Sequence, residues 1–366
     1  MRFDLSDEER AIREAVQGLC RAVYEQRASK MAGADGADEF WPKLSASGWA
    51  QLCLPRLAGG HEAGLLELCL VIEELGYSLA PARYMGNAAA ALVLGGLDDP
   101  HQRGRAAALG DGERWAGFGQ LLADGAGLAV DTAGADFVVL IGDGGAVVVD
   151  PTPPGATGTP GLDLTRRFTR VSGFRGERVT GRLQEASDCI EVLIAAELVG
   201  VAQHAMELAV EHAKQREQFG RPIGAYQAVS HRCADMLVAV ESARSAVLSA
   251  AWTADHMLEE LPFAASVAKV SAAQAGWQVT AAALQVHGGM GFTWEHPIHL
   301  FLRRAAASSR MLGSVDAHLD RIAALNGVAA ASSGDALPAH ELVAPGGRLA
   351  AGRVTPLGQQ AAGQPG

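Results

Sequence analysis

The segment Gln285–Phe292 is the part of the chain best suited to hold a ligand. It reads Gln-Val-His-Gly-Gly-Met-Gly-Phe, with three glycines in four positions at the end of a predicted helix. Glycines permit positive φ and let backbone N–H groups approach an anion without an intervening Cβ. A helix cap followed by a tight turn explains two of the glycines equally well. The segment also lacks the strand–G-x-G-x-x-G–helix order of a Rossmann site, so by itself it indicates a dinucleotide only weakly.

A second set of candidate ligand residues lies where one predicted helix ends and the next begins. Arg216 offers a planar five-donor fork that suits a diphosphate, and Phe219 offers a flat face for a ring. Gln227 starts the following helix, where free backbone donors and an amide can meet a phosphate or an adenosine. The same residues are ordinary at helix ends, and spacing alone favours that interpretation.

Composition excludes several classes of function. The net charge of −11 and the absence of a basic stripe argue against a nucleic-acid partner. The five cysteines are scattered and show no C-x-x-C spacing, which predicts reduced thiols in a cytoplasmic protein. The acidic N-terminus does not resemble a signal peptide, and apolar stretches such as Ala88–Leu94 are too short to span a bilayer. The histidines are too dispersed to predict a metal site.

Hydrophobic periodicity predicts three structural units and a tail. Residues 1–112 read as helical, beginning with a capping box in which Ser6 and Glu9 satisfy each other's backbone donors. Residues 113–184 read as a small β unit, because short β-branched runs flank Asp143-Gly-Gly and surround Gly173. The helical period then returns and predicts four long helices, at about 187–218, 226–260, 262–288 and 297–326. The expected fold class is therefore α+β, mainly α.

The predicted limits assign residues 185–328 to a four-helix bundle with short loops. Pro262 is well placed to start the third of these helices, and Gly288-Gly289 to end it. The tail 329–366 is rich in Gly, Pro, Ala and Gln and has no period, which predicts disorder.

Taken in order, these segments resemble the acyl-CoA dehydrogenase family over nearly the whole chain. The first half carries Trp41, Gly48-Trp49, Pro55, Gly59-Gly60 and Glu73-Glu-Leu-Gly76. The middle carries Ala133-Gly-Ala-Asp-Phe137, Asp163-Leu-Thr-Arg166 and Phe174. The last part carries Arg216-x-Gln-Phe-Gly-x-Pro-Ile223, Tyr226-Gln227, Ala234-Asp-Met236 and Gln285-x-His-Gly-Gly-x-Gly-Phe292. In that order the motifs are highly specific.

The resemblance implies a fold of helical domain, small β domain and C-terminal four-helix bundle, assembled as dimers of dimers. It also implies FAD bound across the subunit interface and oxidation of an acyl-CoA thioester at Cα–Cβ. In the family a glutamate removes the α-proton, hydride passes to flavin N5, and electrons leave to an electron-transfer flavoprotein. Residues that match the family's contacts to the adenosine-diphosphate half of FAD are Arg216, Phe219, Gln227, Gln285, Val286, Gly288 and Gly289.

The first departure from the family concerns the catalytic base. The usual glutamate lies about eight residues past an Arg-Asp pair; here the pair is Arg303-Arg304, and Leu312 takes the glutamate's place. Leucine accepts no proton. Some members place the base early in the first bundle helix, where this chain has Ile190, with Glu191 about 100° around the helix. Asp316, one turn past Leu312, is a weaker candidate still.

The second departure concerns the flavin ring. The family's aromatic-x-x-Thr-Glu-Pro-x-x-Gly-Ser-Asp segment, which wraps the ring and the pyrophosphate, is missing. The stretch from Trp115 to Gly127 stands in its place, within a β unit shorter than is usual for the family.

We therefore predict the non-catalytic subunit of a heteromeric acyl-CoA dehydrogenase with two chains of each kind. A second acyl-CoA dehydrogenase chain would hold the flavin ring, the base and the acyl-CoA. This arrangement resembles the split enzymes that actinobacteria use on CoA-linked side chains of steroids such as cholesterol. Two alternatives stay open: a self-sufficient homotetramer that uses Glu191 or Asp316, and a flavin-free scaffold of the same fold. Retention of Arg216, Gln227 and the glycine segment argues against the scaffold.

Overall fold

The computed structural model describes residues 5–30, 41, 48–54, 63–80, 83–112, 114–142, 145–150 and 157–328. Two sequence expectations fall on residues outside this description: the turn at residues 143 and 144, and the tail 329–366. The family-pattern residues Pro55, Gly59 and Gly60 also lie outside it.

The N-terminal third of the described chain is helical, as predicted. Its elements are α1 (Asp7–Lys30), η1 (Trp49–Cys53), α3 (Leu65–Tyr77), α4 (Arg83–Gly95) and α5 (Pro100–Gly110). The capping box forms: the Ser6 amide donates to the Glu9 carboxylate, and the Glu9 amide donates to Ser6 Oγ at 3.2 Å. α3 is buried on almost every side, and its Gly76 approaches Glu197 of the first bundle helix, while Gly200 of that helix approaches Glu73 of α3. A Cβ on either glycine would collide with the other helix's backbone, so the two glycines permit this close crossing.

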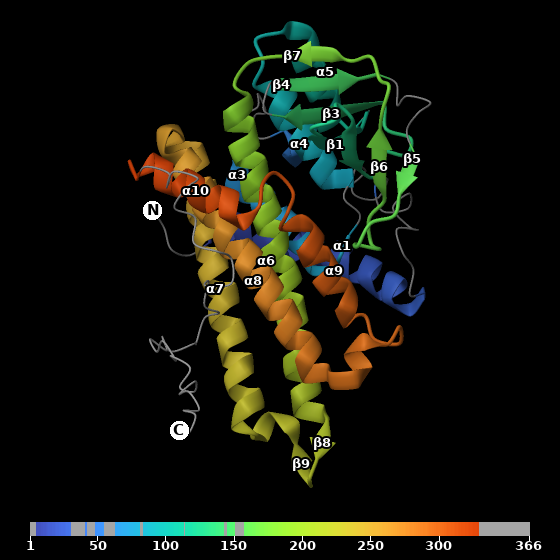
Figure 1. Cartoon of the computed structure of the whole chain (residues 1–366), viewed down its shortest axis with the longest axis vertical. Coiled ribbons are helices and arrows are strands. Elements are labelled where there is room, and N and C mark those ends of the chain that lie inside the picture. The colour runs from blue at the N-terminus through green and yellow to red at the C-terminus, as the bar shows by residue number, and fades with distance from the viewer. Residues whose placement is uncertain are drawn as a thin grey trace, which may run out of the picture.

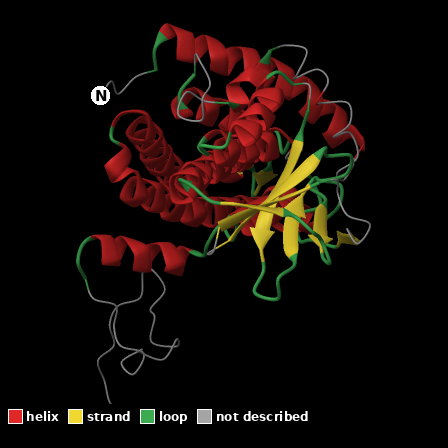
Figure 2. Cartoon of the chain, turned by 90° about the horizontal axis from the view of Figure 1, so that it is seen from above, coloured by secondary structure: helices red, strands yellow, loops and turns green. Residues whose placement is uncertain are grey.

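The middle of the chain forms a seven-stranded sheet among the described residues. The strands are β1 (Ala116–Leu121), β2 (Gly127–Val130), β3 (Phe137–Gly142), β4 (Gly145–Val149), β5 (Thr157–Thr159), β6 (Phe168–Val171) and β7 (Glu177–Val179). Their order across the sheet is β5-β6-β2-β1-β3-β4-β7, and β1–β3 is its parallel pair. Figure 2 shows the strands, in yellow, gathered to one side of the helices. One face of the sheet joins the main core through residues such as Phe118 and Phe137, and α4 packs on β1.

The C-terminal half is a helical bundle. Its elements are α6 (Leu183–Gln215), β8 (Glu217–Gln218), β9 (Arg221–Pro222), η3 (Ile223–Ala225), α7 (Gln227–His256), η4 (Leu258–Glu260), α8 (Leu261–His287), η5 (Gly288–Phe292), α9 (Ile298–Ser308) and α10 (Val315–Leu325). Figure 1 shows α6 running from beside the sheet to the far end of the molecule, where the β8–β9 hairpin projects.

Among the described helices, α6 is the one long and apolar enough to cross a membrane by length and composition. Its apolar window is 94% buried inside the structure, as expected for the core helix of a bundle.

The prediction of one helix from 297 to 326 is wrong. The helix stops at Ser308 and α10 begins at Val315. Between them Leu312 has φ 55° and Gly313 has φ 112°, a left-handed turn that helical hydrogen bonding cannot continue. Ser314 then caps α10 by accepting from the Ala317 amide at 3.2 Å. Strands β1, β2 and β5 were also not predicted as strands.

Candidate functional site

Two regions at opposite ends of α6 contain the residues that the sequence predicts to matter. The first, called the bundle tip below, consists of residues 216–227 and 285–292. The second, called the junction cavity, lies between the sheet, the start of α6 and the α9–α10 connection. Figure 1 shows the separation of these two ends.

A tight hairpin at the bundle tip presents Phe219. Glu217-Gln218 pairs with Arg221-Pro222, and the two residues between them have φ of 53° and 79°. Positive φ at both central positions makes a type I′ hairpin, which normally takes Asn or Gly at the first of them. Here a phenylalanine takes that place, and its side chain is 93% exposed. A strained position that displays an aromatic ring to solvent is typical of a residue whose contacts lie on another molecule.

Arg216 and Gln227 flank this hairpin. The Arg216 backbone is used locally: its amide donates to the His212 carbonyl at 2.8 Å, and its carbonyl accepts from the Ile223 amide at 2.8 Å. Its side chain is exposed, and within the described part of the chain its guanidinium has neither an ion pair nor a hydrogen bond. Gln227 is the exposed first residue of α7, whose N-terminus has no side-chain cap. Both side chains therefore remain available to a ligand.

In the glycine segment, the fold of this chain requires glycine at positions 288 and 291 but not at position 289. Gly288 ends α8 with φ 61° and ψ −140°, a conformation open essentially to glycine alone. Gly291 is buried, and a Cβ there would lie 3.0 Å from the Leu284 carbonyl oxygen. Gly289 has no positive φ, and a Cβ there would meet no atom within 4 Å. The open space beside Gly289 leaves its backbone accessible, which fits a close approach by a diphosphate.

The structure brings the two halves of the bundle tip together. The rings of His212, one turn before Arg216, and His287, next to Gly288, stack with centroids 4.6 Å apart. Gln285 is exposed, and Val286 is half-buried against the core. The predicted contact residues thus lie at one end of the bundle, and all but Val286 face outward, so they form one side of a site.

The junction cavity encloses about 640 Å³. Its walls come from the ends of β1, β3 and β4, the first turns of α6 and the segment 312–321. The lining residues are Gln120, Leu121, Ile141, Gly142, Gly145, Leu183, Gln184, Ser187, Glu191, Leu312, Gly313, Ala317, His318 and Arg321. Leu312 and Glu191 therefore share one cavity, although they lie far apart in the sequence.

The loop that carries Leu312 is held from two sides. The Leu312 carbonyl lies 3.1 Å from His318 Nε2. Lys269 of α8, which is 1% exposed, donates from Nζ to the Ser309 and Gly313 carbonyls at 3.0 and 3.4 Å. Burial lowers the pKa of Lys269 to about 8. Leu312 is thus fixed at the cavity wall, where it contributes an apolar surface and no proton acceptor.

Glu191 is the carboxyl group in the junction cavity. It is 4% exposed, and Arg321 Nη1 donates to its Oε2 at 3.2 Å. The same arginine holds Asp188 at 2.6 Å. Burial, together with the nearby Asp188 carboxylate, raises the pKa of Glu191 to about 8. Glu191 is therefore engaged in tying α10 to α6, and a carboxyl group with this pKa largely retains its proton at neutral pH.

The other two candidate positions lie elsewhere. Ile190 is 1% exposed and belongs to the main hydrophobic core. Asp316 is exposed in the first turn of α10, where a carboxylate is favourable because of the helix dipole, and it is absent from the cavity lining. The structure brings neither residue to the cavity wall.

Sequence reasoning missed a buried ionic cluster that joins the sheet region to the bundle. Arg304 is 0% exposed; its Nε lies 2.6 Å from Asp163 Oδ2 and its Nη1 lies 3.0 Å from Glu197 Oε1. Arg166 pairs with the same Glu197, and burial beside Arg304 lowers the pKa of Arg166 to about 9. Two arginines thus neutralise two carboxylates in the interior. The sequence contained one signal of this cluster, the Arg303-Arg304 pair. If the second arginine of the pair is buried, carboxylates must be buried beside it to balance its charge.

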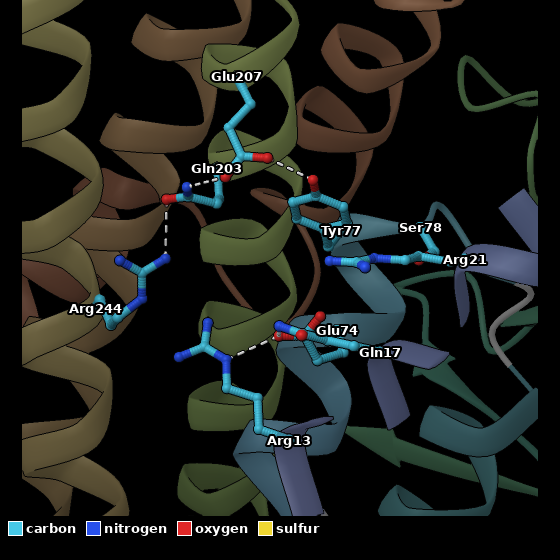
Figure 3. Close-up of a pocket in the computed structure, with 9 residues that line it drawn as sticks. All are labelled: Arg13, Gln17, Arg21, Glu74, Tyr77, Ser78, Gln203, Glu207 and Arg244. Carbon is cyan, nitrogen blue, oxygen red and sulfur yellow. Dashed lines mark hydrogen bonds and ion pairs between the residues drawn. The ribbon is translucent and has the colours of Figure 1, made fainter. Parts of the chain in front are cut away.

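A second, smaller pocket of about 240 Å³ lies between α1, α3, α6 and α7 (Figure 3). All of its lining residues are polar: Arg13, Gln17, Arg21, Glu74, Tyr77, Ser78, Gln203, Glu207 and Arg244. Several satisfy one another, because Arg13 donates to Glu74 at 2.8 Å and Arg244 donates to Gln203 at 3.0 Å. None is a residue that the sequence predicts to bind a ligand. The pocket therefore reads as a polar crossing point of four helices.

Comparison with known proteins assigns the N-terminal helical region and the C-terminal bundle to one family. Residues 6–99 match the model of the acyl-CoA dehydrogenase N-terminal domain, and residues 191–325 match that of the acyl-CoA dehydrogenase C-terminal domain. Acyl-CoA dehydrogenase IpdE2 of Mycobacterium tuberculosis is 33% identical over 312 residues, covering 84% of this chain and 94% of the relative.

Two solved structures are also similar in fold. A variant of the Tcur3481-Tcur3483 steroid ACAD has a TM-score of 0.75 and 25% identity, covering 86% of this chain and 97% of that one. The ChsE4-ChsE5 complex from Mycobacterium tuberculosis has a TM-score of 0.75 and 24% identity, covering 90% of this chain and all of the matched chain (100%). The expected mostly helical fold with a small sheet is thereby confirmed.

Proposed function

The chain belongs to the acyl-CoA dehydrogenase family, and from this premise we propose that it is the non-catalytic subunit of a heteromeric acyl-CoA dehydrogenase. One observation carries the proposal: the bundle tip keeps its outward-facing ligand groups, while the cavity wall has Leu312 where the family has its base. The three-domain division predicted from the sequence (residues 1–112, 113–184 and 185–328) is part of the same proposal.

The proposed contribution of this chain is to binding. Arg216 would hold the diphosphate of an FAD whose ring lies in the partner, through a charge-assisted contact. The backbone at Gly288 and Gly289 would approach the same diphosphate, while Phe219 and Gln227 would contact the adenosine side, with Gln285 and Val286 next to them. When bound, FAD supplies the hydride acceptor for Cα–Cβ desaturation. A half-site makes only some of the contacts that offset the entropic cost of ordering FAD. The tip by itself would therefore bind FAD weakly.

The self-sufficient alternative has one observation in its favour. Glu191 and Leu312 line the same cavity, so a carboxyl group is present close to the place of the missing base. One feature weighs against it. The Glu191 side chain is 4% exposed and is held by Arg321, which also holds Asp188, so this carboxyl group serves to tie α10 to α6. We therefore assign the base to the partner chain.

The relatives indicate a partner and a substrate class. Two solved relatives are named as pairs of proteins, and one of them is named as a steroid ACAD. We propose a complex of two copies each of this chain and of a second acyl-CoA dehydrogenase chain. It would act in the cytoplasm on a steroid side-chain CoA ester and pass electrons to an electron-transfer flavoprotein.

Co-expression with a second acyl-CoA dehydrogenase chain, sought first among the neighbouring genes, tests the proposal. The purified complex would be assayed for reduction of an artificial acceptor with a steroid side-chain CoA ester and with a fatty acyl-CoA of similar chain length. We expect turnover from the complex and none from this chain alone. Full turnover by this chain without a partner would contradict the proposal.

A further inference from the structure

Three histidines from three different segments form a column beneath the bundle tip. His212 lies in the last turn of α6, His287 ends α8, and His296 lies in the loop before α9. The rings of His212 and His287 stack at 4.6 Å with an interplanar angle of 23°. The rings of His287 and His296 lie 4.3 Å apart with an angle of 46°. The column therefore bridges the helix end that carries Arg216 and the helix end that carries Gly288.

The hydrogen bonds of the column fit uncharged rings. His287 Nδ1 lies 2.8 Å from the Ala283 carbonyl, so Nδ1 carries the proton of the neutral ring. Its Nε2 is buried and has no hydrogen-bond partner among the residues that the structure describes, in a side chain that is 5% exposed. His296 Nδ1 accepts from the Ile298 amide at 3.2 Å, so its proton lies on Nε2. A proton added to His287 Nε2 would create a buried cation with no acceptor.

The charged groups that act on the column are also unfavourable to protonation. Burial, His287 and Arg216 lower the pKa of His212. Burial and the neighbouring His287, His212 and His299 lower the pKa of His296 to about 4, and burial lowers the pKa of His287. His299 in turn faces Arg303. The hydrogen bond to the Ala283 carbonyl raises the pKa of His287, but burial outweighs it, so the balance at each ring favours the neutral form.

We propose that this neutral histidine column sets the spacing between the two ligand-contacting segments of the bundle tip, and that its protonation separates them and releases the cofactor. The proposal rests on the proposed role of the tip in holding FAD. Stacked imidazolium rings repel one another, and a charged His287 would have to move toward solvent. Because His287 adjoins Gly288, that movement displaces the glycine backbone relative to Arg216.

The sign of the pH dependence follows from the lowered pKa values. The histidine pKa is about 6.5 in an unfolded chain, and the pKa values of these three histidines are lower in the fold. Their neutral rings therefore contribute fully to the stability of the ordered tip above about pH 6.5. That contribution is lost as the pH falls through the lowered values, of which that of His296 is about 4. Cofactor retention should therefore weaken with acidity by up to about tenfold per pH unit for each proton taken up.

The test compares His287→Phe, which keeps a flat ring that cannot be protonated, with His287→Ala, which removes it. His256→Ala is the matched control, because His256 also stacks on a neighbouring ring, that of Trp252, but is exposed on α7 outside the tip. Flavin retained by the complex after gel filtration would be measured from about pH 8 to about pH 4.5. We expect acid loss in the wild type and in the control, a much flatter profile in His287→Phe, and weak retention at every pH in His287→Ala.

A second measurement does not depend on the cofactor. Hydrogen exchange in residues 213–226 and 285–297 of the flavin-free full chain, corrected for intrinsic rates, should accelerate in both segments together as pH falls, and less so in His287→Phe. If the variant at His287 does not fold, His212→Phe at the half-buried end of the column replaces it. Unaltered acid profiles in the Phe variants, or normal retention in His287→Ala, would overturn the proposal. If the complex holds no flavin at any pH, but hydrogen exchange still accelerates in both segments together as pH falls, the proposed function is rejected and the role of the histidine column is supported.

Discussion

The two ends of helix α6 carry functional side chains in opposite states. At the junction cavity, Asp188 and Glu191 are buried, and Arg321 pairs with both. At the bundle tip, Arg216 and Phe219 are exposed, and Arg216 finds no partner among the described residues. Charges that a chain satisfies internally serve its own packing, whereas charges and rings left exposed at a strained turn are available to another molecule. Under the proposed function, the junction cavity is the end that no longer does catalysis and the bundle tip is the end that binds the cofactor.

The strongest contrast should appear between the buried and the exposed arginine. Arg304→Met leaves Asp163 and Glu197 buried with one cation fewer, which should cost about 3–5 kcal/mol of unfolding free energy. Arg216→Ala should change the unfolding free energy by less than about 0.5 kcal/mol. Urea unfolding of both variants measures the contrast. Equal effects of the two substitutions would show that Arg216 also serves the fold of this chain.

Arg216→Ala should instead act on the cofactor. Loss of a charge-assisted contact to a diphosphate typically costs about 1.5–3 kcal/mol, or roughly ten- to a hundredfold in affinity. Flavin content of the complex after gel filtration is the readout, and the affinity for acyl-CoA should stay the same. If flavin content is unchanged, Arg216 is an ordinary helix-end arginine.

Glu191→Gln tests whether the buried end is catalytically silent. Turnover of the complex should stay within about twofold of the wild type, as it should for Asp316→Asn, whereas loss of a general base costs about a hundredfold or more. Abolished turnover in an assembled complex would make this chain catalytic.

The same variant tests the pH dependence of stability. The pKa of the Glu191 carboxyl in the fold is raised to about 8, so the folded state holds a proton that the unfolded state releases above about pH 4.3. Wild-type stability should thus decline as pH rises toward 8, and Glu191→Gln should lack that decline when urea midpoints are compared.

Two neighbouring glycines provide the smallest and best matched comparison. Gly288→Ala forces a side chain into a positive-φ conformation and should lower the unfolding free energy by about 1 kcal/mol or more. Gly289→Ala has neither positive φ nor a steric conflict in this chain, so stability should be nearly unchanged. We expect Gly289→Ala nevertheless to reduce flavin content, because its Cβ would occupy the space facing the ligand. A neutral effect on flavin would remove Gly289 from the site.

Local signals predicted those parts of the fold that depend on local interactions. The Ser6–Glu9 box, Pro262 at the start of α8 and Gly288 at its end all lie where the sequence places them. Strands β1, β2 and β5 were missed because they are short and contain glycine, as in Ala116-Gly-Phe-Gly, and glycine lowers strand propensity. The break at Leu312 was missed because a leucine at positive φ leaves little trace in a sequence.

The candidate site divides in the same way. The family resemblance, carried by two short motifs, predicted the tip residues, whereas their spacing alone did not. The meeting of Glu191 with Leu312, and of Arg304 with Asp163 and Glu197, depends on helix packing across more than a hundred positions and needed the structure. The assignment of the tip residues to FAD is still a prediction.

Flavin content of this chain alone and of its complex tests the central claim most directly. Both would be purified in the same way, and flavin absorbance would be measured per mole of each chain. We predict a colourless or unstable chain alone, because half a site cannot offset the cost of ordering the cofactor, and a yellow complex. A soluble, yellow homo-oligomer of this chain with about one FAD per chain would contradict the claim.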